Sequence, residues 1–245
     1  YNNLASSVIG FCGADNQGLS GIEAKWDNIL KGTPGKIVSY KASDQNEIPN
    51  TEETYISAEN GSDITLTIDL NIQSIVEKYL KQAVEKYDCA NGGNVIVMDP
   101  KTGNILGMAN YPDYNLNTPY TPNSVLAKTY DSLSDEEKNE ALYRMWANKS
   151  VSDSYEPGST FKIITSSVAL EENITTPNKP NDFYCQGYEV VEDRTIKCWR
   201  KYDPHGSQTL TQALENSCNP AFMQLASRIG APTLYKYYQA FGLFD

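Results

Sequence analysis

Glu156-Pro-Gly-Ser-Thr-Phe-Lys162 is the stretch of sequence that decides the fold and points to the chemistry of this chain. Its Pro157-Gly158 pair favours the start of a helix, which places Ser159 at or near the helix N-terminus. Lys162 follows three residues later, a spacing that puts two side chains on the same helix face. The hydroxyl then lies near the positive end of the helix dipole, beside an amine that can act as a base. The alternative is a capped helix end with a solvated lysine.

A second polar pair, Ser217 and Asn219, flanks Cys218 in a break between two predicted helices. The serine can relay a proton, and the asparagine amide can hold an amide substrate or orient the lysine. The alternative is that Asn219 is an N-cap placed before Pro220. One histidine, His205, excludes every mechanism that needs two.

Together, S-x-x-K followed by S-x-N resembles the motif set of penicillin-binding proteins and class A β-lactamases. The chain is similar to class B penicillin-binding proteins from about Gly10 to its end. Besides the two motifs, the resemblance is carried by Gly18–Glu23, Val97–Leu106, Asn110–Pro112, His205-Gly206 and Leu214–Asn219. It departs from the family at Cys218, the middle residue of the second motif, and at Asn148-Lys149, where an Asn-Arg pair is usual.

The resemblance implies an α+β fold of the penicillin-binding/serine β-lactamase-like transpeptidase type, present here as its N-terminal portion. Residues 1–57 would be the C-terminal tail of a non-catalytic, dimerisation-type pedestal domain with a linker, and residues 58–245 the first part of the transpeptidase domain. The family's third motif, K-[ST]-G, follows S-x-N. Lys101-Thr-Gly103 has these letters but precedes Ser159, and no such tripeptide follows Asn219. We therefore expect activity only with a C-terminal part that this chain lacks.

Periodicity gives an α+β or mixed class, because a strand, a helix and a hairpin precede mostly helices. The predicted strands are 64–68, 94–99 and 104–109, the last two forming a hairpin around the turn 100–103. The predicted helices are 21–30, 72–84, 134–148 with a capping box, 160–171, 209–216 and 220–230. The polar stretch 40–60 is predicted to be a linker or a domain edge, and 179–206 to be rich in turns.

The resemblance implies a serine-type D,D-transpeptidase that cross-links peptidoglycan stem peptides through an acyl-enzyme. Ser159 would attack the carbonyl of the penultimate D-alanine, and Lys162 would take its proton. Ser217 and Asn219 would relay protons and hold the substrate, and β-lactams would acylate Ser159 and stay bound. Two competing classes are a β-lactamase or D,D-carboxypeptidase with the same nucleophile, and a non-catalytic penicillin-binding sensor or scaffold.

A third cluster combines two thiols, an imidazole and a carboxylate. It comprises Asp182, Cys185, Cys198 and His205. Such ligands suit a tetrahedral Zn²⁺ ion, and four protein ligands would make the site structural. We favour Asp182 as fourth ligand because two residues separate it from Cys185, with Asp203 and Cys218 as alternatives. The competing interpretation is a Cys185–Cys198 disulfide with a structural His205.

The charge balance excludes some partners. Among 245 residues, 20 Lys and Arg face 31 Asp and Glu, for a net charge of −11. This disfavours nucleic acids and anionic lipid surfaces, which bind basic side chains. No apolar stretch reaches the roughly 20 residues that span a bilayer. The resemblance implies the extracytoplasmic face of the bacterial cell membrane, an anchor in a missing N-terminal segment, and peptidoglycan stem peptides, β-lactams and cell-wall synthesis proteins as partners.

Overall fold

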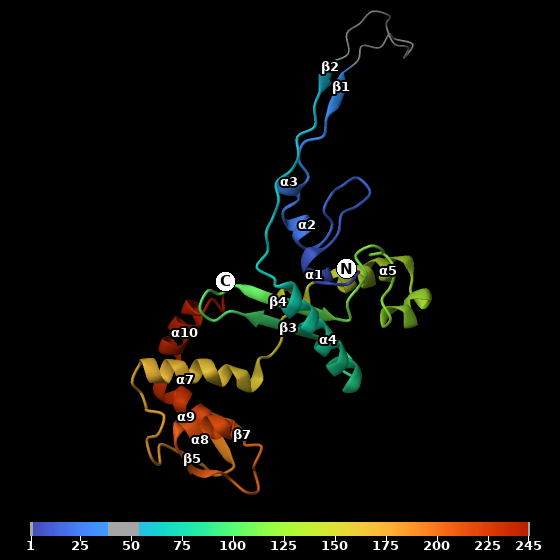
Figure 1. The fold of residues 1–245 in the computed structure, drawn as a ribbon. Coiled ribbons are helices and arrows are strands. Elements are labelled where there is room, and N and C mark those ends of the chain that lie inside the picture. Colours follow the sequence, from blue (N-terminus) through green and yellow to red (C-terminus); the bar gives the residue numbers. More distant parts are fainter. Residues whose placement is uncertain (1, 39–53, 245) are drawn as a thin grey trace, which may run out of the picture. The chain divides into compact units, whose positions relative to one another are not determined.

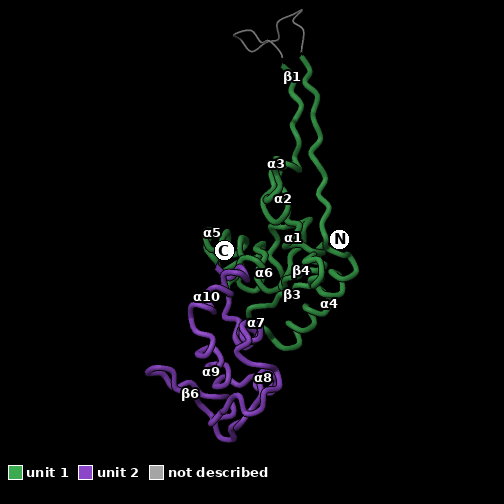
Figure 2. Tube along the Cα trace, turned by 90° about the vertical axis from the view of Figure 1, so that its left-hand side faces the viewer, with its two compact units in different colours: residues 1–154 green, residues 155–245 purple. Residues whose placement is uncertain are grey.

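The computed structural model of the chain describes residues 2–38 and 54–244 (Figure 1). Most of the predicted linker, residues 40–53, lies outside the described residues. The chain forms two compact units, unit 1 (residues 1–154) and unit 2 (residues 155–245) (Figure 2). These units do not coincide with the predicted sequence domains, whose boundary at residues 57 and 58 stays a prediction.

Among its described residues, unit 1 combines helices with two antiparallel strand pairs, β1–β2 and β3–β4. Its helices are α1 (Ser6–Ile9), α2 (Gly21–Lys25), α3 (Asp27–Leu30), α4 (Leu70–Lys86), α5 (Asp135–Trp146) and α6 (Lys149–Ser152), with 3-10 turns η1 (Leu126–Lys128) and η2 (Tyr130–Ser132). Its strands are β1 (Lys36–Val38), β2 (Thr54–Ile56), β3 (Gly93–Met98) and β4 (Ile105–Tyr111).

Helix α4 packs on the β3–β4 hairpin and buries Leu80 and Val84 against Ala109 and Tyr111 (Figure 1). It begins where the Asp69 side chain accepts hydrogen bonds from the first-turn backbone N–H groups, which leaves fewer of them unsatisfied. The predicted helix and hairpin are confirmed here, and the helix is longer than predicted at both ends. The predicted capping box that opens α5 is also present.

The strand predicted over residues 64–68 is wrong, because this described segment has no strand conformation. Apolar and polar residues alternate in it, but it lacks the ladder of backbone hydrogen bonds that makes a strand. Within this segment the Thr67 hydroxyl donates to the Ile105 carbonyl at 2.7 Å, and just after it the Asp69 N–H donates to the Leu106 carbonyl at 2.9 Å. Leu66, on its apolar face, remains 37% exposed.

Unit 2 is mainly helical, with two small antiparallel pairs, β5–β8 and β6–β7. Its elements are η3 (Gly158–Phe161), α7 (Lys162–Glu171), β5 (Phe183–Cys185), β6 (Tyr188–Val191), β7 (Arg194–Lys197), β8 (Gly206–Gln208), α8 (Leu210–Glu215), α9 (Asn219–Ile229) and α10 (Ala231–Ala240). The pattern of the sequence predicted α7, α8 and α9, but neither the strands within the turn-rich segment 179–206 nor α10.

The core of unit 2 lies between α7 and α9, which run next to each other (Figure 1). Val168, Ala169 and Leu225 are fully buried in it, and the same core contains the side chains of Cys185 and Cys218. The side chains of these two cysteines are thus part of the packing that joins α7 and α9 to the short strands.

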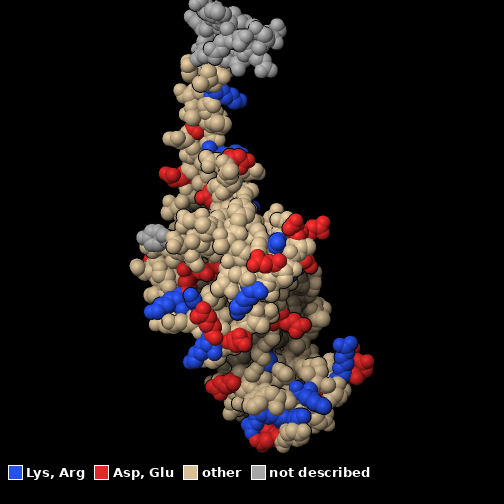
Figure 3. Space-filling model, turned by 90° about the vertical axis from the view of Figure 1, so that its right-hand side faces the viewer, with Lys and Arg blue, Asp and Glu red and all other residues tan. Residues whose placement is uncertain are grey.

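On the face drawn in Figure 3, basic and acidic side chains are interspersed among the described residues. None of the described helices is both long and apolar enough to span a bilayer.

Candidate active site

Ser159 and Lys162 meet at the junction of η3 and α7. Ser159 lies in the 3-10 turn and Lys162 is the first residue of the α-helix. Because residues three apart eclipse each other in a 3-10 turn, the Lys162 Nζ lies 3.2 Å from the Ser159 Oγ. Gly158 precedes them with φ at 57° and open space where a Cβ would stand. It is therefore required for its left-handed backbone and not for a close approach.

The amine of Lys162 joins both sequence motifs. Its Nζ lies 2.8 Å from the carbonyl oxygen of Ser217, 2.9 Å from the Ser217 Oγ and 2.7 Å from the Asn219 Oδ1. The Ser217 hydroxyl also donates to the Ser159 Oγ at 2.9 Å. The structure therefore brings all four predicted catalytic residues together within unit 2.

Ser217 occupies the tight connection between α8 and α9 and has φ at 47°, in the left-handed region that non-glycine residues rarely adopt. Its N–H donates to the Leu214 carbonyl, and the next N–H, of Cys218, donates to the Ala213 carbonyl. Outside this turn, the indole N–H of Trp199 donates to the Asn216 carbonyl at 2.9 Å. Backbone strain of this kind persists where the surroundings impose it, and it is enriched at functional sites.

Burial lowers the pKa of Lys162 from its ordinary value, and the nearby thiols of Cys218 and Cys198, when charged, oppose this. A neutral amine has two N–H donors and one lone pair. If the donors serve the two nearest acceptors, the Asn219 Oδ1 and the Ser217 carbonyl, the lone pair is free to take the Ser159 proton. The site can thus generate an alkoxide nucleophile.

Two interpretations that competed at the level of sequence are wrong. Lys162 is half-buried among four acceptors and is not simply solvated. The side chain of Asn219 accepts from Lys162, and the residue at the N-cap of α9 is Cys218.

Two residues around the site were missed by sequence reasoning. The ring of Phe222 lies with its centroid 5.4 Å from the Lys162 Nζ, an arrangement that stabilises the protonated amine. Its position three residues after Asn219, on the same helix face, could have revealed it. Trp199 gave no such signal, because its contact with residue 216 is not local.

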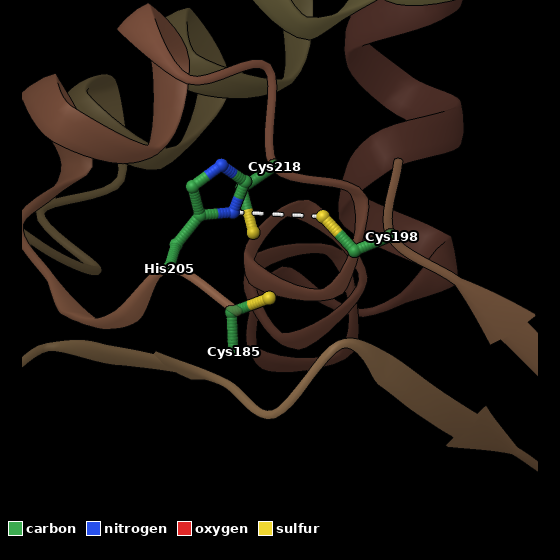
Figure 4. A group of neighbouring side chains, drawn as sticks. All are labelled: Cys185, Cys198, His205 and Cys218. Atoms are coloured by element: carbon green, nitrogen blue, oxygen red, sulfur yellow. Dashed lines mark hydrogen bonds between the residues drawn. The ribbon is translucent and has the colours of Figure 1, made fainter. Parts of the chain in front are cut away.

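The thiol and imidazole residues form a cluster beside this site (Figure 4). One donor atom from each of Cys185, Cys198, His205 and Cys218 lies within 4.8 Å of all the others. The Cys198 Sγ is 3.5 Å from the His205 Nδ1. The structure thus brings together three of the four residues predicted as metal ligands and adds Cys218, which was an alternative for the fourth. All three thiols are free, so the alternative Cys185–Cys198 disulfide is not formed.

Asp182, the residue favoured as fourth ligand, does not join the cluster. It lies three residues before Cys185 on extended chain, and an odd separation points two side chains to opposite faces. Although burial opposes it, hydrogen bonds from Thr175 and Lys179 and the charge of Arg228 hold the pKa of Asp182 below its usual range. This carboxylate is therefore already neutralised by cations.

Asp203, the other alternative, pairs with Arg200 and also stays outside the cluster. Burial first, and then the neighbouring Cys185 sulfur, raise the pKa of Cys218 to about 11.

Comparison with known proteins gives the same fold. Residues 93–244 match the penicillin binding protein transpeptidase domain family. The chain is 37% identical over 242 residues to the stage V sporulation protein D of Bacillus subtilis (strain 168), covering 99% of this chain and 34% of that protein. It is 26% identical to the peptidoglycan D,D-transpeptidase FtsI of Escherichia coli (strain K12), covering 98% of this chain and 36% of FtsI.

Among solved structures, it is similar to penicillin binding protein 3 of Mycobacterium tuberculosis in complex with ampicillin, with a TM-score of 0.70 at 25% identity, covering 98% of this chain and 45% of that one. The chain thus spans about a third of the length of these curated relatives. With its S-x-x-K and S-x-N motifs assembled around one amine, the chain belongs to the penicillin-binding protein transpeptidase family and, within it, to the class B penicillin-binding proteins.

Proposed function

We propose that this chain carries the nucleophile and proton-transfer groups of a serine-type D,D-transpeptidase that cross-links peptidoglycan stem peptides. The observation that carries the proposal is the position of the Lys162 amine, within 3.2 Å of the Ser159 hydroxyl and within 2.9 Å of groups from the second motif. The family match and the similarity to FtsI, a peptidoglycan D,D-transpeptidase, support it.

In the proposed reaction, the neutral Lys162 amine takes the Ser159 proton as the Oγ attacks the carbonyl of the penultimate D-alanine. The Oγ–C bond forms, and negative charge collects on the former carbonyl oxygen. The backbone N–H of Ser159, in the η3 turn that precedes α7, can donate to this oxygen. Lys162 then returns the proton through the Ser217 hydroxyl to the leaving nitrogen, and the C–N bond breaks. Asn219 holds the lysine and the substrate amide.

A neighbouring strand completes the reaction, because its amine attacks the acyl-enzyme and Lys162 again moves the proton. A β-lactam follows the same first steps, but its leaving nitrogen stays attached to the acyl group and blocks the second attack. The structure with ampicillin is of a relative, and it supports assigning β-lactams to this site as inhibitors. The family's K-[ST]-G motif does not follow Asn219 in this chain, so the proposal concerns the protein with a complete transpeptidase domain.

The family also supports a place on the extracytoplasmic face of the bacterial membrane, with a membrane anchor and cell-wall synthesis proteins as partners. These assignments come from the resemblance to the family.

Labelling of the protein, produced with its complete domain, by a fluorescent penicillin tests the proposal, with Ser159→Ala as control. A covalent label that depends on Ser159 and turns over slowly is expected. Rapid release of the label would instead indicate a β-lactamase or carboxypeptidase. Absence of a Ser159-dependent label would indicate a non-catalytic scaffold.

A further inference from the structure

We propose that Cys185, Cys198, His205 and Cys218 bind one Zn²⁺ ion, and that this ion fixes the loop that presents Ser217 and Asn219 to Lys162. The second half of the statement rests on the proposed function. The first half rests on the cluster alone.

The cluster has the composition and spacing of a structural zinc site. Zinc takes four ligands in a tetrahedron, and Zn–S bonds of about 2.3 Å place neighbouring sulfur atoms about 3.8 Å apart. The donor atoms here already lie within 4.8 Å of one another and converge on one point (Figure 4). A contraction of about 1 Å would therefore complete the coordination shell. Three soft sulfur ligands and an imidazole favour zinc over magnesium or calcium.

Burial argues against any competing role for these thiols. Cys185 and Cys218 are 0% exposed and Cys198 is 2% exposed, so none is accessible as a nucleophile. The four residues come from three separate segments: the end of β5, the two ends of the connection between β7 and β8, and the residue before α9. Such short strands have little core of their own, and a metal ion would join them at one point.

Cys218 links the cluster to the catalytic residues. Its side chain points into the cluster, whereas those of its two neighbours, Ser217 and Asn219, contact the Lys162 amine. Fixing the Cys218 sulfur therefore fixes the backbone from which both catalytic side chains extend.

A second connection runs through Trp199, which follows Cys198. Its indole N–H donates to the Asn216 carbonyl, and its ring packs edge-on against the His205 imidazole with centroids 5.5 Å apart. The ion would thus hold residues on both sides of the Ser217 turn, whose left-handed backbone requires support from its surroundings.

The metal is tested directly on the protein with its complete transpeptidase domain, purified under reducing conditions without chelators. Elemental analysis should find about one zinc ion per chain, as expected for a closed four-ligand site. Exchange with Co²⁺ should give sulfur-to-cobalt charge-transfer absorption and the strong visible bands of tetrahedral cobalt. Protein that binds no zinc after reconstitution, or that contains a Cys185–Cys198 disulfide under these conditions, would overturn the site.

Variants then test the ligand set. Cys198→Ser and His205→Asn should each weaken zinc affinity at least about tenfold. Cys89→Ser, at an exposed cysteine of unit 1, is the matched control, and Asp182→Asn tests the ligand favoured from sequence; both should keep zinc at wild-type affinity. Unchanged affinity in Cys198→Ser, or loss of zinc in Asp182→Asn alone, would contradict the assignment. Cobalt spectra of the wild-type protein do not depend on whether any variant folds.

The effect of zinc on the loop that carries Ser217 and Asn219 is measured separately, by the acylation rate. Removing zinc from the wild-type protein with a chelator should slow acylation by a fluorescent penicillin at least about tenfold, and added Zn²⁺ should restore the rate. An unchanged acylation rate in zinc-free protein would refute the coupling and leave the site in place. If the wild-type protein is not labelled at Ser159 at all, the proposed function fails, while the zinc measurements still decide the metal site.

Discussion

Lys162→Ala is the substitution that should lower the acylation rate strongly while changing the stability of the fold little. The variant removes a base, and such groups contribute about 10²–10⁴-fold to rates. At 1.36 kcal/mol per tenfold, this corresponds to about 3–5 kcal/mol of the acylation barrier. The loss should lie toward the upper end of this range, because the same amine also holds Ser217 and Asn219 in position.

The effect of Lys162→Ala on folding should be much smaller. The substitution leaves the Ser217 carbonyl and the Asn219 Oδ1 without their donor, but both residues are only partly buried, so water can replace it. The expected cost is about 1 kcal/mol, or about 2–4 °C in melting temperature.

Stopped-flow acylation by a fluorescent penicillin measures the rate, and thermal unfolding measures the stability of the same preparations. Lys162→Met, which keeps most of the side-chain volume, should show the same loss of rate with less destabilisation. Lys236→Ala, at an exposed lysine of α10 in the same unit, should change neither quantity. Acylation of Lys162→Ala within about tenfold of the wild-type rate would refute the assignment of Lys162 as the base.

The structure makes three further predictions. The acylation rate should rise with pH and level off below the ordinary lysine pKa of 10.5, because burial lowers the pKa of Lys162 and the neutral amine is the active form. A rate that falls with rising pH would contradict this. Ser217→Ala removes one acceptor of Lys162 and the donor to Ser159. The acylation rate should therefore fall about 10–100-fold, which is less than in Lys162→Ala. An equal loss of rate in the two variants would indicate that Ser217 does more than relay a proton. Asp182→Ala should destabilise the protein by about 1–3 kcal/mol at neutral pH, because it leaves Arg228 unpaired. As the pKa of Asp182 is lowered on folding, its stabilising contribution is lost as pH falls through that folded-state pKa, so wild type and variant should converge in acid, as measured by urea unfolding at several pH values.

Local sequence signals predicted most of the elements that carry the site. The α7 and α9 helices have their own start signals, the Pro157-Gly158 pair and Pro220, and the short-range spacing of Ser159 and Lys162 survives the change from α-helix to 3-10 turn. Such signals work because helix starts and i, i+3 contacts depend only on neighbouring residues. The meeting of the two motifs is a long-range contact, and its prediction came from the family resemblance.

Errors arose where a prediction needed a partner distant in sequence. Residues 64–68 alternate like a strand, but pairing depends on another segment and did not follow. Asp182 was favoured as a ligand for its closeness to Cys185 in sequence, whereas the extended backbone turns it to the other face, toward Arg228. Cys218 is 20 residues or more from the other cysteines, and only the fold shows that it belongs with them.

The side chains of Ser217 and Asn219 point to Lys162, and the side chain of Cys218 between them points to the thiol cluster. Three consecutive residues thus meet two different structural requirements. The outer positions contact the Lys162 amine, so a substitution at either one changes the surroundings of this amine directly. The middle position, Cys218, packs in the core of unit 2. A substitution there is therefore expected to need matching changes in that core. Substitutions within these three residues therefore fall into two groups, those that act on the amine directly and those that act on it through the core beneath the loop.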